Sequence, residues 1–209
     1  MYFVSSLCLP AALLFSTLLP PAPHLTSPLV LTLQASGGSG GSDITAFVDG
    51  VEIIDAVTGR AVSGAVPNAG FELPAQPGHV YNPAGGTWTF TSRAGVARNG
   101  SEFGSPAAPE GAQVAFLQSV NADSGYLQQE LPTLPPGVYQ VRLRVAQRAC
   151  CYGTFDQGVR VWVDQTLLGT IVPDRDGQFH LYTSSSFTLT QPTRRPSPAA
   201  FPPVRPSRR

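Results

Sequence analysis

The chain of 209 residues contains no lysine, and charged residues make up only 12% of it, about half of the share usual in soluble domains. All 13 basic residues are arginines, and they balance 13 acidic residues. Five of the arginines lie in residues 192–209, so residues 1–191 carry eight arginines and a formal charge of −5. Outside residues 192–209 no basic stripe is interleaved with aromatic residues, which argues against a nucleic-acid partner.

Cysteine is also scarce, with three in the chain. Cys150 and Cys151 are adjacent, and a disulfide between neighbours is strained because the preferred Cα separation exceeds that of consecutive residues. Their spacing fits no zinc site. The three histidines are far apart in the sequence, at His24, His79 and His180. No serine elbow, Cys/His couple or phosphate-binding glycine loop is present, so we expect a protein that is not an enzyme.

The first 27 residues contain an apolar run from Leu7 to Leu19 but no basic residue before it and no clean small-x-small cleavage site. A secretory signal and a mis-assigned start of the reading frame therefore remain equal alternatives. The run is too short and too interrupted by proline for a stable membrane span. The rest of the chain is typical of an extracellular or cell-surface protein.

Strand signals dominate what is present. The chain has 21 glycines and 21 prolines, and its turn residues separate short apolar segments about 8–12 residues apart. No segment keeps a helical period. The segments expected to be strands are AGFELP, TWTFT, QVAFLQ, GYLQQEL, GVYQVRLRVAQR, VRVWVDQTLLGTIVP, FHLYTS and SFTLTQ. This pattern predicts an all-β fold, an antiparallel β-sandwich or jelly roll.

These segments, beginning with VPNAGFELP and running from Val66 to Thr190, resemble in their order a galactose-binding-like jelly-roll domain. Such domains occur in secreted bacterial proteins and carbohydrate-binding modules, and the plant cell-wall proteins called DUF642 look related. The resemblance implies a final hairpin after Thr190, but residues 192–209 are rich in proline and arginine, and we expect them to be disordered.

Residues 28–54, with LVLTLQ, a glycine loop and SDITAFVDGVEI, resemble that missing hairpin. The chain can be a piece of a tandem array, holding the end of one repeat and most of the next. Alternatively, the N-terminal segment folds back over the linker of residues 55–65 and completes the domain of residues 66–191, as in a circular permutant. We favour completion, because it covers otherwise open sheet edges.

The resemblance also implies a structural calcium ion. In related carbohydrate-binding jelly rolls, a glutamate of the opening segment and an aspartate of the closing strand often hold calcium. These roles correspond to Glu72 and Asp49. Carboxylates and backbone carbonyls suit this ion. The alternative is that both residues form ordinary salt links or solvated edge carboxylates.

A sugar-binding surface requires an exposed aromatic platform. Alternation along GVYQVRLRVAQR and VRVWVD places Arg142 and Arg144 on one face of the first strand and Arg160 and Trp162 on one face of the second. If the two strands share a sheet, these four side chains form one surface. Aromatic rings stack on sugar faces, and guanidinium groups hold hydroxyls or uronate carboxylates. Trp162 covered by a loop and paired with arginine is the alternative.

Tyr152 is an additional candidate at a strand end, whereas Trp88 is expected in the core. Three interpretations follow. The chain is a non-catalytic carbohydrate-binding module of a secreted or surface protein, with a polysaccharide or glycan as partner. Alternatively, it is a structural or adhesive repeat that binds neighbouring repeats and no glycan. The third possibility is a truncated gene product with no function of its own.

Overall fold

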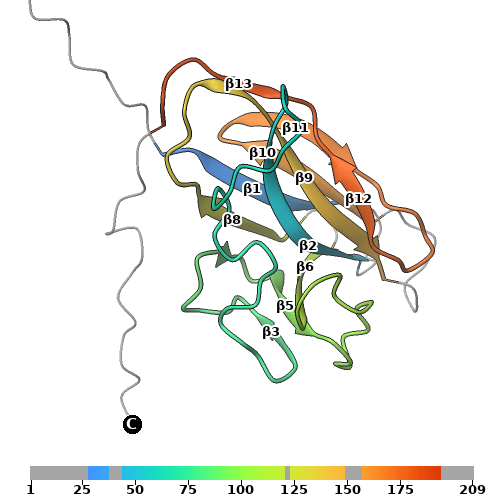
Figure 1. Cartoon of the computed structure of the whole chain (residues 1–209). Helices are drawn as coiled ribbons and strands as arrows, with labels where there is room; N and C mark the ends of the chain where they lie inside the picture. Colours follow the sequence, from blue (N-terminus) through green and yellow to red (C-terminus); the bar gives the residue numbers. More distant parts are fainter. Residues whose placement is uncertain (1–27, 38–43, 121–122, 149–156, 194–209) are drawn as a thin grey trace, which may run out of the picture.

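The computed structural model describes residues 28–37, 44–120, 123–148 and 157–193, and its described part is all-β without helices (Figure 1). The strands are β1 (Val30–Ser36), β2 (Ile44–Asp55), β3 (His79–Tyr81), β4 (Thr89–Phe90), β5 (Ala94–Arg98), β6 (Gln113–Val120), β7 (Asp123–Ser124), β8 (Tyr126–Glu130), β9 (Gly137–Gln147), β10 (Gly158–Val163), β11 (Thr166–Ile171), β12 (His180–Thr183) and β13 (Phe187–Leu189). Within these residues no helix is long and apolar enough to cross a membrane.

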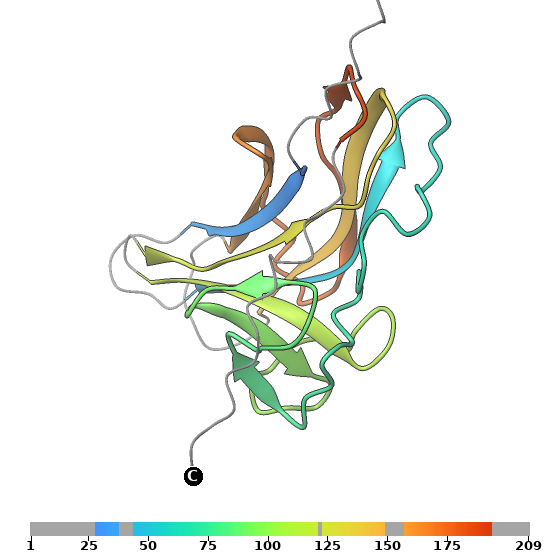
Figure 2. The ribbon, with the colours of Figure 1, turned by 90° about the vertical axis from the view of Figure 1, so that its left-hand side faces the viewer.

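Two antiparallel sheets pack face to face, which confirms the predicted all-β sandwich (Figure 2). The smaller sheet has five strands in the order β11-β10-β1-β8-β4. The larger sheet has eight strands, with the order β12-β9-β2-β6-β5-β3, and β13 and β7 pair with β9 and β6.

The N-terminal segment contributes an inner strand to each sheet. β1 lies between β10 and β8, where Leu33 is opposite Val161 on one side and Leu127 on the other. β2 lies between β9 and β6. The two strands therefore pair with different neighbours and not with each other, so the segment bridges the sheets instead of forming a hairpin within one of them. Both sheets depend on residues that precede the rest of the domain in sequence.

The core between the sheets follows from strand alternation. On β1, Leu31 and Leu33 are fully buried, whereas Thr32 and Gln34, which alternate with them, face outward and are half-buried. Each fully buried leucine contributes roughly 1.5–3 kcal/mol to stability. Val161 of β10 and Leu143 of β9 face the same interior.

Burial does not alternate along β2, because side chains are buried on the outer face of this strand as well as on the face toward the core. Phe47 points away from the main core into a second cluster with Phe103 and Phe116. The ring centroids of Phe103 and Phe116 are 4.2 Å apart. The loop that carries Phe103 thus covers one end of the larger sheet.

The segment predicted as a linker, residues 55–65, folds back along β2. The Asp55 carboxylate accepts hydrogen bonds from the peptide N–H groups of Val57 and Thr58 and closes a turn. Val62 then donates its N–H to the carbonyl of Ile53. At the other end of the domain, Thr193 exchanges hydrogen bonds with Leu134. Thr193, which the sequence places in the tail, is thus hydrogen-bonded to the loop before β9, and the predicted leader and residues 194–209 of the tail lie outside the described residues.

Candidate functional site

The outer face of the smaller sheet carries polar and aromatic side chains in register across three strands. Thr32 of β1 is opposite Trp162 of β10 and Gln128 of β8. Gln34 of β1 is opposite Arg160 and Tyr126 in the next outward-facing row. The inward-facing neighbours of these residues belong to the core, so the six side chains share the solvent side of the sheet.

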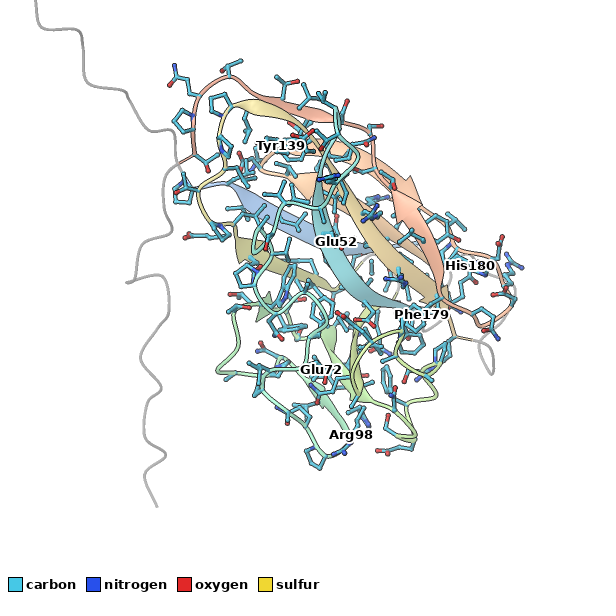
Figure 3. All side chains as sticks on the ribbon, in the orientation of Figure 1. Glu52, Glu72, Arg98, Tyr139, Phe179 and His180 are labelled. Atoms are coloured by element: carbon cyan, nitrogen blue, oxygen red, sulfur yellow. The ribbon has the colours of Figure 1, made fainter. Side chains whose placement is uncertain are left out.

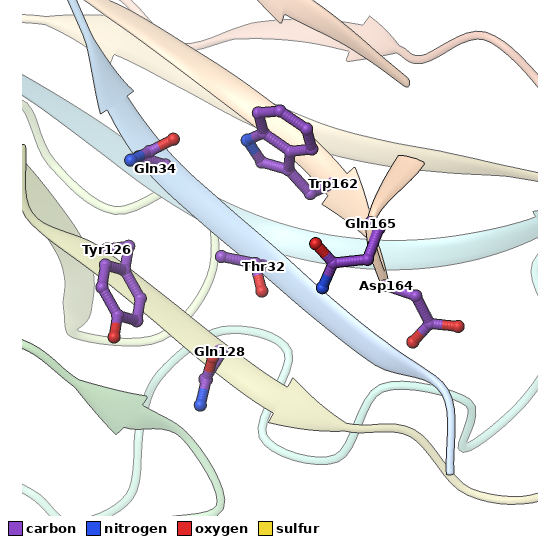
Figure 4. Close-up of a pocket in the computed structure, with 7 residues that line it drawn as sticks. All are labelled: Thr32, Gln34, Tyr126, Gln128, Trp162, Asp164 and Gln165. Carbon is purple, nitrogen blue, oxygen red and sulfur yellow. The ribbon is translucent and has the colours of Figure 1, made fainter. Parts of the chain in front are cut away.

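A pocket of about 290 Å³ lies over this array. Figure 4 shows the residues that line it: Thr32, Gln34, Tyr126, Gln128, Trp162, Asp164 and Gln165. Asp164 and Gln165 come from the turn between β10 and β11. This turn is fixed to β1 because the Asp164 Oδ1 atom accepts a hydrogen bond of 2.9 Å from the peptide N–H of Val30.

Trp162 is half-buried, and its indole Nε1 has no hydrogen-bond acceptor within the part of the chain that the structure describes. In Figure 4 the nitrogen lies on the side of the ring that faces Gln34. A buried donor without an acceptor costs about 1–3 kcal/mol.

The lining combines ring faces with many neutral hydrogen-bonding groups. Tyr126 is 37% exposed, so its ring is available to a ligand together with that of Trp162. The amides of Gln34, Gln128 and Gln165 each offer a donor and an acceptor. The pocket can thus bind a molecule that has one apolar face and several hydroxyl groups at its edge.

The single arginine surface predicted from the sequence is not formed, because β9 and β10 lie in different sheets. The chain crosses from the larger to the smaller sheet between these strands. Arg160 keeps its place beside Trp162, whereas Arg142 and Arg144 face outward on the opposite sheet. The Arg142 Nε atom donates a hydrogen bond of 2.9 Å to the Glu52 carboxylate. Tyr152 lies outside the described residues.

Sequence reasoning found Trp162 but missed the side chains that β1 and β8 contribute. The signal was present in LVLTLQ, where Thr32 and Gln34 alternate with leucines, but not in GYLQQEL, where Gln128, Gln129 and Glu130 are consecutive polar residues. Strand order was the missing information. Only the insertion of β1 between β8 and β10 brings Tyr126 and Gln128 to the same face as Trp162.

The two carboxylates that the resemblance assigns to calcium lie at a corner between β2 and the loop before β6. Asp49 is fully buried, and its carboxylate accepts hydrogen bonds from the peptide N–H groups of Gly50 and Glu110. The Glu72 Oε1 atom accepts hydrogen bonds from the N–H groups of Ala112 and Gln113 at 2.9 and 3.0 Å. Figure 3 shows the side chain of Glu72 in this region.

The electrostatics of this corner are unfavourable for a charged Asp49. Burial raises the pKa of its carboxyl from the ordinary 3.8 to about 7, the hydrogen bonds from Glu110 and Gly50 oppose the rise, and the nearby carboxylates of Glu110 and Glu72 add to it. A cation here would relieve the repulsion. However, the described residues contain no group of three or more His, Cys, Asp or Glu side chains placed to hold a metal ion.

Comparison of the chain with protein-family models, with curated proteins and with solved structures finds no match in any of the three. The functional conclusion therefore depends on the geometry and chemistry of the site.

Proposed function

We propose that the chain is a non-catalytic carbohydrate-binding module and that the outer face of the smaller sheet around Trp162 is its glycan-binding surface. The observation that carries the proposal is the position of Trp162 in the wall of a pocket that is also lined by Tyr126 and by neutral side-chain amides. Aromatic rings stack on the apolar faces of sugars, and side-chain amides pair with their hydroxyl groups.

The ligand is an extended glycan and not a single sugar. Trp162 and Tyr126 lie on strands separated by β1, and one outward-facing row apart. With strands about 4.8 Å apart and about 3.4 Å per residue, the two Cα atoms are about 12 Å apart. One pyranose ring cannot cover both aromatic side chains at this spacing. A ligand that contacts both rings must therefore contain more than one sugar unit.

Binding without catalysis is supported by the groups in the pocket. Asp164 is the single carboxylate in its lining, and one of its oxygens is held by the Val30 N–H. Glycoside hydrolysis generally uses a pair of carboxyl groups on either side of the scissile bond. A module of this kind acts outside the cell, on a secreted or cell-surface protein, by keeping that protein on a polysaccharide.

A calcium ion at Asp49 and Glu72 is a second part of the proposal. Its support is the buried, electrostatically unfavourable carboxyl of Asp49 next to two further carboxylates. Calcium takes six to eight oxygen ligands, so backbone carbonyls and water would have to complete the set. The role of the ion would be structural, because it would join β2 to the loop that precedes β6.

Affinity electrophoresis on gels that contain soluble polysaccharides tests the binding proposal. We expect at least one neutral polysaccharide to retard the wild-type chain and Trp162→Ala to abolish the retardation. Tyr126→Ala should weaken it. Leu181→Ala is the matched control, because Leu181 is 53% exposed on the larger sheet and outside the pocket. A folded wild-type chain that no glycan retards would overturn the proposal and favour a structural or adhesive repeat.

A further inference from the structure

Arg144 of β9 differs from Arg142 of the same strand and from Arg148, which follows the strand, in its lack of a partner among the described residues. Arg142 is ion-paired with Glu52, and Arg148 donates to the carbonyl oxygen of Phe103 and lies over its ring, 4.4 Å from the centroid. By contrast, Arg144 is half-buried and makes no hydrogen bond or ion pair with any residue in the described ranges. Its guanidinium group offers five donors in a planar fork.

The fold makes room for this guanidinium group. The register of β2 against β9 shifts between Asp49 and Glu52, and Gly50 in this bulge has a φ of 56°. The Arg144 Nη1 atom lies 3.1 Å from the point that a Cβ atom on Gly50 would occupy. The missing side chain thus leaves a notch in β2 that receives the end of Arg144.

The carboxyl group opposite Arg144 does not neutralise it. Asp49 is the cross-strand partner of Arg144. Its oxygens instead accept hydrogen bonds from the backbone N–H groups of Gly50 and Glu110. On the other side, Asp176 is ion-paired with His180, 2.7 Å away. The guanidinium charge of Arg144 is therefore available to a ligand.

A pocket of about 500 Å³ opens at this position. Two loops form its walls, and the lining residues are Pro106, Ala107, Pro109, Arg144, Gly177, Gln178 and Phe179. Phe179 lies next to the end of β9 in Figure 3. The pocket therefore combines one cation with apolar ring and methyl surfaces, an amide and exposed peptide groups.

We propose that this pocket is a second binding site, separate from the one at Trp162, and that it takes the carboxylate of an acidic sugar, a uronate. The guanidinium group binds the carboxylate through paired charge-assisted hydrogen bonds. The proline and phenylalanine rings contact the C–H face of the sugar, and the Gln178 amide accepts or donates to its hydroxyl groups. The site does not depend on neutral glycan binding, since the two pockets lie on opposite sheets.

Titration of the ¹⁵N-labelled chain with D-galacturonate and with D-galactose, followed by amide NMR spectra, tests this proposal. We expect galacturonate to shift the amide signals of residues 177–179 and to bind at least about tenfold more tightly than galactose. Arg144→Gln should remove that preference, and Arg144→Lys should reduce it, because lysine keeps the charge but loses the fork. Arg98→Gln, which removes an exposed arginine that lines neither pocket, is the matched control and should leave the preference unchanged.

Trp162→Ala separates this site from the first. Loss of neutral glycan binding with an unchanged response to galacturonate is the expected result. Equal affinities for galacturonate and galactose in the wild-type chain would overturn the proposal, whatever the outcome at Trp162. A galacturonate preference that survives in a folded Arg144→Gln variant would overturn it as well.

Discussion

The buried carboxyl of Asp49 should make the stability of the fold depend on pH in an unusual direction. In the unfolded chain this group ionises near 3.8, whereas in the folded chain its pKa is about 7. Between these values the unfolded state has lost the proton that the folded state keeps. The free energy of unfolding therefore falls as the pH rises from about 4 to about 7, and it levels off above that range. A difference of about 3 pKa units corresponds to roughly 4 kcal/mol.

Urea unfolding of the wild-type chain and of Asp49→Asn between pH 4.5 and 8, in EDTA, measures this effect. The variant has no titrating group at this position, so the difference between the two unfolding free energies isolates Asp49. We expect the wild-type chain to lose stability relative to the variant by about 3 kcal/mol over this range, because a smaller part of the loss occurs below pH 4.5. A difference that is constant with pH would refute the assignment of a buried, desolvated carboxyl.

Asp55 provides a control, because its pKa shift is opposite in direction to that of Asp49. Hydrogen bonds from the backbone N–H groups of Thr58 and Val57 lower the pKa of this exposed carboxyl. Its contribution to stability is present above the ordinary pKa of 3.8 and is lost as the pH falls through the lower folded value. Asp55→Asn should therefore leave the slope between pH 4.5 and 8 unchanged and alter it only below this range.

Three further results are expected. Deletion of residues 1–56 removes an inner strand from each sheet, so circular dichroism of the shortened chain should show no cooperative thermal transition. A thermal transition like that of the full chain would contradict the insertion of β1 and β2 into the sheets. Gly95→Ala places a Cβ atom 2.1 Å from the Val80 carbonyl oxygen and should lower the free energy of unfolding in urea by about 1–3 kcal/mol. Gly78 has open space around it, so Gly78→Ala is the control and should lower it by less than about 0.5 kcal/mol. Equal losses in the two variants would refute the packing at Gly95. Calcium, but not magnesium, should raise the melting temperature of the wild-type chain at pH 8 and leave that of Asp49→Asn unchanged; the same response in both proteins would exclude Asp49 as a ligand.

The fold class could be predicted from the sequence because alternation and turn residues are local signals. The expectation that SDITAFVDGVEI belongs to the sandwich agrees with the position of β2 between β9 and β6. What local signals do not contain is the identity of each strand's neighbours. The sequence therefore gave no indication that β1 and β2 enter different sheets.

The candidate site shows the same limit. Trp162 was identifiable because an aromatic residue at an outward-facing strand position is uncommon. Arg142 and Arg144 were grouped with it on the condition that β9 and β10 share a sheet, which local signals do not decide. The crossing between the sheets separates them, and it leaves Arg144 beside a different pocket. Four of the residues that line the pocket with Trp162 come from β1 and β8, which are distant from it in the sequence: Thr32, Gln34, Tyr126 and Gln128.

The most direct test of glycan binding at Trp162 is ¹⁹F NMR of the chain labelled with 5-fluorotryptophan. The chain has two tryptophans, and Trp88, which is 3% exposed in the core, serves as the internal reference. Oligosaccharides from a polysaccharide that retards the chain should shift the Trp162 signal to saturation and leave that of Trp88 in place. A Trp162 signal that stays fixed while the chain binds the polysaccharide would contradict the assignment of this face as the binding surface.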